Sequence, residues 1–104
     1  MFNKIVIIYT TVASLQQAET LAEKVVAGKL AACANIIPGA LSIYEWQGQL
    51  EKTTEYLIIF KTALSKSELL YKWLLNNHPY SVPAIIKILA DTYKGFSDYV
   101  NAQT

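Results

Sequence analysis

Arginine is missing from this sequence of 104 residues, and charged residues of either sign are scarce. All nine basic residues are lysines, eight residues are acidic, and the formal net charge is +1 at neutral pH. Arginine is the side chain best suited to grip phosphate or guanine through two parallel hydrogen bonds. Its absence, together with so small a net charge, predicts that the protein binds neither nucleic acid nor an anionic membrane surface.

A second cysteine and a long hydrophobic segment are missing as well. Cys33 is alone and cannot form an internal disulfide, which indicates a reducing compartment. The apolar run at residues 5–9 is too short to be a signal sequence or to span a bilayer. We therefore expect a cytoplasmic protein.

Motifs for cofactors and catalysis are also absent. The four glycines are isolated, so no phosphate-binding loop is present, and no pair of cysteines or histidines has metal-ligand spacing. The sequence predicts that no cofactor is required and that the protein is not an enzyme.

What the sequence does contain is apolar residues, at 53% against only 16% charged. Typical domains have about 45–50% and about 25%. A chain of this length forms one domain, here residues 1–104, with much surface to cover. We expect part of its apolar surface to face another subunit, with a merely apolar monomer as the alternative.

The apolar patterns predict an α+β domain with elements in the order βαββαβ and a short C-terminal helix. Ser14 is a good N-cap for the first helix, and Ser65 to Glu68 has the spacing of a second capping box. Pro38-Gly39 indicates a bulge in an edge strand, and Gln47-Gly48 a two-residue hairpin turn. The expected strands are residues 4–11, 31–46, 50–62 and 84–90; the expected helices start after Ser14, at Ser65 and near Phe96.

This order predicts a ferredoxin-like sandwich, a four-stranded antiparallel sheet with both long helices on one face. The strands at 4–11 and 50–62 are then central, and both are apolar on both faces. Because the helices cover one face only, we expect the open face to meet another subunit.

Cys33 and His78 are the candidate reactive residues. The predicted topology places them at opposite ends of the domain, too far apart for a nucleophile–base pair. Cys33 is then best interpreted as a small buried apolar residue. His78 follows a helix C-terminus, and capping of that helix and contact with a ligand or metal are both open interpretations.

Aromatic residues gather on the predicted hairpin. Tyr44, Trp46 and Tyr56 lie there, and because a long hairpin extends past the helices, we expect them at a subunit interface, with core packing as the alternative. Lys61 and Tyr80 are predicted to lie at the same inter-subunit cleft. The hairpin glutamates, Glu55 among them, are interpreted as solvated or paired charges.

Several of these segments together resemble the CutA divalent-cation tolerance family. The matching stretches are residues 31–39, residues 42–44, Trp46 with Gly48, residues 59–62, and residues 77–83. The resemblance implies a ferredoxin-like subunit in a tight homotrimer, with hairpins wrapping neighbours as in the PII signalling proteins. It also implies a role in divalent metal tolerance, with copper binding in bacterial members.

The chain departs from the family at two positions near the proposed copper site. Some bacterial relatives have cysteine in place of Tyr9 and a second histidine in place of Asn77, while His78 matches the retained one. We therefore expect a homotrimer that binds a divalent cation such as copper weakly through His78. A PII-like trimer that binds a small anion in the cleft is the alternative, and a hydrolase that uses Cys33 is a third hypothesis.

Overall fold

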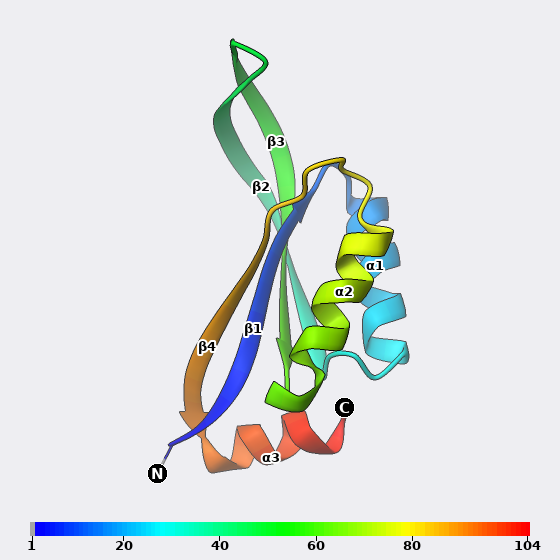
Figure 1. Ribbon diagram of the computed structural model, residues 1–104, viewed down its shortest axis with the longest axis vertical. Helices are drawn as coiled ribbons and strands as arrows, with labels where there is room; N and C mark the ends of the chain where they lie inside the picture. The colour runs from blue at the N-terminus through cyan, green and yellow to red at the C-terminus, as the bar shows by residue number, and fades with distance from the viewer. Residues whose placement is uncertain (1) are drawn as a thin grey trace.

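Four strands form one antiparallel sheet, in the order β2-β3-β1-β4, in the computed structural model, which describes residues 2–104 (Figure 1). The strands are β1 (Phe2–Val12), β2 (Cys33–Trp46), β3 (Gln49–Thr62) and β4 (Ile85–Tyr93). The helices α1 (Leu15–Ala27) and α2 (Ser67–Asn77) cover one face, and α3 (Lys94–Ala102) closes the end that holds the chain termini. The predicted ferredoxin-like α+β fold is confirmed, with β1 and β3 central.

The capping predictions were right for α1 and wrong for α2. The hydroxyl of Ser14 accepts a hydrogen bond from the Gln17 backbone N–H, as an N-cap should. Ser65 instead lies inside a short 3-10 turn, η1 (Leu64–Lys66), and α2 begins only at Ser67 with no side-chain cap. The hydroxyl of Ser67 donates back to the Leu64 carbonyl, which ties this turn to the helix.

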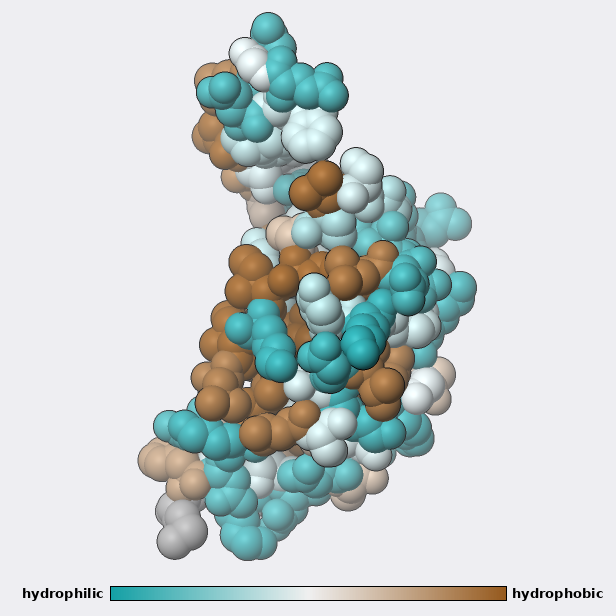
Figure 2. Space-filling view, in the orientation of Figure 1, coloured by the Kyte–Doolittle hydropathy of each residue, from teal (hydrophilic) through white to brown (hydrophobic). Residues whose placement is uncertain are grey.

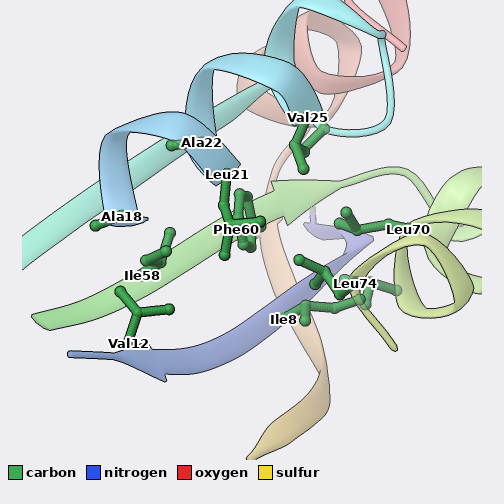
Figure 3. Close-up of a cluster of buried hydrophobic side chains, with 12 residues drawn as sticks. Ile8, Val12, Ala18, Leu21, Ala22, Val25, Ile58, Phe60, Leu70 and Leu74 are labelled. Atoms are coloured by element: carbon green, nitrogen blue, oxygen red, sulfur yellow. The ribbon is translucent and has the colours of Figure 1, made fainter. Parts of the chain in front are cut away.

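The main core lies between the sheet and the two covering helices (Figure 3). β1 and β3 contribute the side chains that point to the helices, because alternate residues of a strand face opposite sides. α1 and α2 each contribute one stripe of apolar side chains to this core. The fully buried members drawn from these four elements include Ile8, Val12, Val25, Ile58, Phe60, Leu70 and Leu74.

β2 and β3 continue beyond the helices as a projecting two-stranded ribbon, residues 40–55 (Figure 1). The register shifts between Ile37 and Ala40, so the predicted bulge at Pro38-Gly39 is confirmed. Gln47 and Gly48 both have positive φ, as a type I′ hairpin turn requires. The ribbon makes the molecule 46 Å long but at most 26 Å across.

The two sides of the ribbon differ in chemistry. Directly paired residues of antiparallel strands point to the same side. Tyr44, Trp46 and Glu55 therefore share one side, here called the inner side. Leu41, Ile43 and Leu50 share the other, the outer side.

None of the helices formed by residues 2–104 is both long and apolar enough to cross a membrane.

Candidate functional site

The loop at residues 78–84, which joins α2 to β4, crosses the end of β1 at the base of the ribbon (Figure 1). It brings together three polar side chains from distant parts of the sequence: His78, Tyr80 and Glu55. Hydrogen bonds connect them in that order. These contacts link the loop both to the end of α2 and to β3.

Both ring nitrogens of His78 are engaged. Nδ1 accepts a hydrogen bond of 3.1 Å from the Tyr80 backbone N–H, and Nε2 lies 2.9 Å from the hydroxyl oxygen of Thr10. Since Nδ1 accepts, the neutral ring carries its proton on Nε2. Burial lowers the pKa of His78 below 6.5, and a hydrogen bond with the Thr11 backbone and the charge of Glu55 offset this only in part. The ring is therefore neutral at pH 7.

Glu55 is the buried carboxylate of the site, with 8% of its surface exposed. The Tyr80 hydroxyl donates a hydrogen bond of 2.7 Å to its Oε2. Burial alone raises the pKa of this carboxyl, but hydrogen bonds with Ser42, Tyr80 and Thr11 outweigh burial and hold the pKa below 4.5. Burial, and after it the hydrogen bond to Glu55, raise the pKa of the Tyr80 phenol. Glu55 is therefore ionised and Tyr80 is neutral at pH 7.

A cavity of about 600 Å³ opens between the inner side of the ribbon and the 78–84 loop. Its walls combine aromatic rings, hydroxyls and the Glu55 carboxylate. The lining residues are Thr11, Ala13, Tyr44, Trp46, Thr53, Thr54, Glu55, Pro79, Tyr80, Ser81, Val82 and Ala84.

The structure brings only some of the predicted cleft residues together. Tyr44, Trp46 and Tyr80 line the cavity. Tyr56 points the other way and packs against the main core. Lys61 lies further along β3, where its Nζ donates 2.7 Å to Asn35 and sits 5.9 Å from the Phe96 ring centroid. A small anion in the cavity would thus meet Glu55 without Lys61.

Cys33 lies far along the sheet from His78. Cys33 pairs with Lys61, which itself pairs with Ile7, whereas His78 contacts Thr10. Three residues along β1 correspond to about 10 Å, before the sideways offset of the edge strand is added. The two side chains do not form a dyad in this fold.

The three positions that the sequence resemblance relates to copper, Tyr9, Asn77 and His78, do not converge in this chain. Tyr9 points to the opposite face of β1 from Thr10, because successive residues of a strand alternate. The Asn77 amide donates to the Trp73 carbonyl on its own helix. Within residues 2–104 no three His, Cys, Asp or Glu side chains gather where they could hold a metal ion.

These residues do not fit a metal centre within one chain. A neutral imidazole has one lone pair for a metal, and that of His78 is occupied by the Tyr80 N–H. Copper and similar ions usually need several N or S donors. His78 would have to release Tyr80 before it could bind a metal.

Glu55 was misjudged from the sequence, where it was interpreted as a solvated or paired charge. Its spacing from Leu57 and Ile59 places the three on one face of β3, but α1 and α2 leave that face open, so the spacing does not predict burial. The burial of Glu55 involves its contact with Tyr80, 25 residues away, which carries no local signal.

Comparison with known proteins identifies the relatives of this chain. The family model described as CutA1 divalent ion tolerance protein matches residues 6–103. The divalent-cation tolerance protein CutA of Escherichia coli O139:H28 (strain E24377A / ETEC) is 42% identical over 96 residues, 92% of this chain and 84% of that protein, and the Shigella boydii serotype 18 protein matches equally.

Solved structures of CutA proteins are also similar to this chain. The crystal structure of divalent ion tolerance protein CutA1 from Ehrlichia chaffeensis has a TM-score of 0.92 and 33% identity, covering 99% of this chain and 96% of that one. CutA from Synechococcus elongatus PCC7942 has a TM-score of 0.94 and 30% identity, covering 99% and 93%. The chain belongs to the CutA1 divalent ion tolerance protein family.

Proposed function

We propose that this protein acts in tolerance to divalent cations as a non-enzymatic homotrimer, in which the open sheet face and the outer side of the ribbon are covered by neighbouring copies. The observation that carries the proposal is the amount of apolar surface that one chain leaves exposed. The number of three subunits comes from the family resemblance.

The open face of the sheet is the first of these surfaces. It is built by the strand residues that alternate with the core residues, and they are mostly branched aliphatic. Ile86 and Ile88 on β4 and Ile37 on β2 are about half exposed. With them on this face lie Ile7, Tyr9, Leu57 and Ile59. An apolar row across four strands is typical of a subunit interface.

The outer side of the ribbon is the second surface. Ile43 is 58% exposed and Leu50 is 70% exposed. Figure 2 shows hydrophobic surface along one side of the projecting ribbon. The ribbon extends past the core that residues 2–104 form, so these side chains stay exposed, and contact with another copy would remove this surface from water.

Light scattering coupled to gel filtration tests the assembly. We expect a mass of three chains for the wild type at micromolar concentration. Ile88→Asp should shift it toward monomer, since a charge would then lie on the open face. Lys87→Asp is the matched control, because residue 87 points to the opposite side of β4. A monomeric wild type would refute the proposal.

The non-enzymatic part of the proposal is supported by the state of the candidate reactive groups. Cys33 and His78 lie apart, and His78 is committed to two hydrogen bonds. We also propose a cytoplasmic location, supported by the free thiol of Cys33. Fractionation of cells with an antibody to the protein tests this location.

We propose that contact between His78 and copper is weak, because the ring must first break its hydrogen bond with Tyr80. Divalent-cation tolerance would then depend on the assembly and not on storage of the metal in a tight site.

A further inference from the structure

Lys61 places a positive charge on the open face of the sheet. It shares this face with Ile7 and Ile59, because directly paired residues and alternate residues of strands point to the same side. Its Nζ donates 2.7 Å to the side-chain oxygen of Asn35 and lies 5.9 Å from the centroid of the Phe96 ring, and both of these groups are neutral. An ammonium group has three N–H donors, and Asn35 takes one of them.

Glu55 places a negative charge on the same face, at the base of the ribbon. The ion pairs among residues 2–104 join Lys4 to Asp91 and Lys94 to Asp98, and neither involves Glu55. The groups that contact its carboxylate are hydroxyls, which are neutral. Buried charges in proteins are normally paired, because removal from water is otherwise unfavourable.

The lysines of the sheet do not supply a partner for Glu55 within one chain. Lys61 is six residues away on β3, which corresponds to about 20 Å along a strand. Lys4 and Lys87 project on the side of the sheet that the helices cover, and Lys52 projects on the outer side of the ribbon. Among the four strands, which lie within residues 2–104, Lys61 is thus the one lysine on the open face.

The proposed assembly covers the surface that carries both charges. Covering a lone charge with apolar surface opposes association, unless the opposite charge arrives with the covering copy. In a closed ring of copies, one patch of each copy meets a different patch of the next. A negative charge at the ribbon end of the open face and a positive charge at the α3 end satisfy this requirement. Glu55 also lines a cavity that is open to the outside of the chain, so an ammonium group can reach its carboxylate.

We propose that Lys61 of each copy pairs with Glu55 of the next copy, so that the carboxylate site of one chain is completed by its neighbour. The inference rests on the assembly proposed above and names the contact that sets the order of the copies around the ring. Asn35 acts as a positioning residue, since it holds the Lys61 ammonium on the open face.

The sign of the effect of Lys61→Met gives the sharpest test. If Lys61 pairs with Glu55 of a neighbour, its removal leaves a buried carboxylate uncompensated and weakens the assembly. If Lys61 is covered without a partner, methionine removes an unpaired charge and strengthens the assembly. Dilution series in a fixed urea concentration, followed by light scattering, measure the protein concentration at which half of the chains are assembled. We expect Lys61→Met to raise it at least tenfold, and Lys87→Met, on the helix side of β4, to leave it unchanged.

A double-variant cycle identifies the carboxylate. Glu55→Gln alone should also raise the midpoint concentration at least tenfold. Combined with Lys61→Met it should raise the midpoint no further than the larger single effect, whereas independent sites would multiply their effects. Glu51→Gln is the matched control, because Glu51 also lies on the inner side of the ribbon, and its effect should multiply with that of Lys61→Met. The Lys61→Met test keeps Glu55 intact, so it stands even if Glu55→Gln folds poorly.

The outcomes separate a failure of the ion pair from a failure of the assembly. A monomeric wild type refutes the assembly and the ion pair with it. An assembled wild type whose midpoint is unchanged or lowered by Lys61→Met refutes the ion pair alone, and so do multiplied effects of Glu55→Gln and Lys61→Met. In the Ile88→Asp monomer, Lys61→Met should leave the urea unfolding midpoint unchanged. A loss of stability there would show that Lys61 acts within its own chain, which would also overturn the proposal.

Discussion

The hydroxyl of Tyr80 donates a hydrogen bond of 2.7 Å to the carboxylate of Glu55, while the backbone N–H of the same tyrosine donates to Nδ1 of His78. One residue thus fixes the 78–84 loop at two points, through its side chain to β3 and through its backbone to the end of α2. The position of this loop sets one wall of the cavity. Changes at Tyr80 should therefore affect both stability and the charge of the site.

Replacement of Tyr80 by phenylalanine removes the donor and leaves the buried carboxylate short of one hydrogen bond. We expect Tyr80→Phe to lower the free energy of unfolding by about 1–3 kcal/mol and to raise the pKa of Glu55. Urea unfolding at one fixed protein concentration measures the first effect. Tyr93→Phe, at an exposed position of β4, should change it by less than about 0.5 kcal/mol. Equal values for the two variants would contradict a stabilising role for the hydroxyl.

Stability should fall as the solution becomes acidic. His78 and Glu55 both have pKa values lowered by folding, so the unfolded chain binds more protons than the folded one. Their contribution to the free energy of unfolding is complete above pH 6.5. It falls in a first window below pH 6.5, as His78 becomes protonated, and in a second window below pH 4.5, as Glu55 becomes protonated. The difference between the urea midpoints at pH 7.5 and pH 5.5 measures the first window. His78→Gln should make this difference smaller. If the wild type lost no more stability between pH 7.5 and pH 5.5 than His78→Gln does, protonation of His78 would not be the cause of the first window.

Copper should bind to His78 only weakly. Loss of the hydrogen bond from Tyr80 leaves a partly buried N–H unpaired and costs about 1–3 kcal/mol, which corresponds to an affinity about ten- to hundredfold below that of a free histidine. Calorimetric titration of Cu(II) into the wild type and His78→Ala measures this. A double variant, His78→Ala with Lys72→His, places the only histidine on the exposed side of α2 and should bind more tightly than the wild type. If the wild type instead bound Cu(II) tightly and His78→Ala abolished that binding, a metal centre would form at His78.

The order of elements could be predicted from the sequence because each signal is local. Ser14 caps α1 through a residue three positions away, and Pro38-Gly39 disrupts the ladder where it stands. Ser65 misled the prediction because it has the spacing of a capping box, whereas here it lies in the 3-10 turn that precedes α2.

The candidate site was only half predictable, and the reason is sequence distance. Tyr44 and Trp46 were assigned to the hairpin correctly because they directly precede its Gln47-Gly48 turn, which is a local signal. Lys61 is on the same strand as Glu55 but six residues away, and its contacts are with Asn35 and Phe96. The burial of Glu55 depends on a loop that arrives from Tyr80, so no local pattern reveals it.

Two adjacent leucines of α2 separate core packing from subunit contact. Leu74 is fully buried against the sheet, whereas Leu75 is 47% exposed. Leu74→Ala should lower the free energy of unfolding by about 2–5 kcal/mol, because it removes buried methyl groups and leaves a cavity. Leu75→Ala should change it by less than about 1 kcal/mol. Both are measured by urea unfolding, with gel filtration alongside. A large loss for Leu75→Ala together with a smaller particle would mean that α2 also contacts another copy, in addition to the open sheet face and the ribbon.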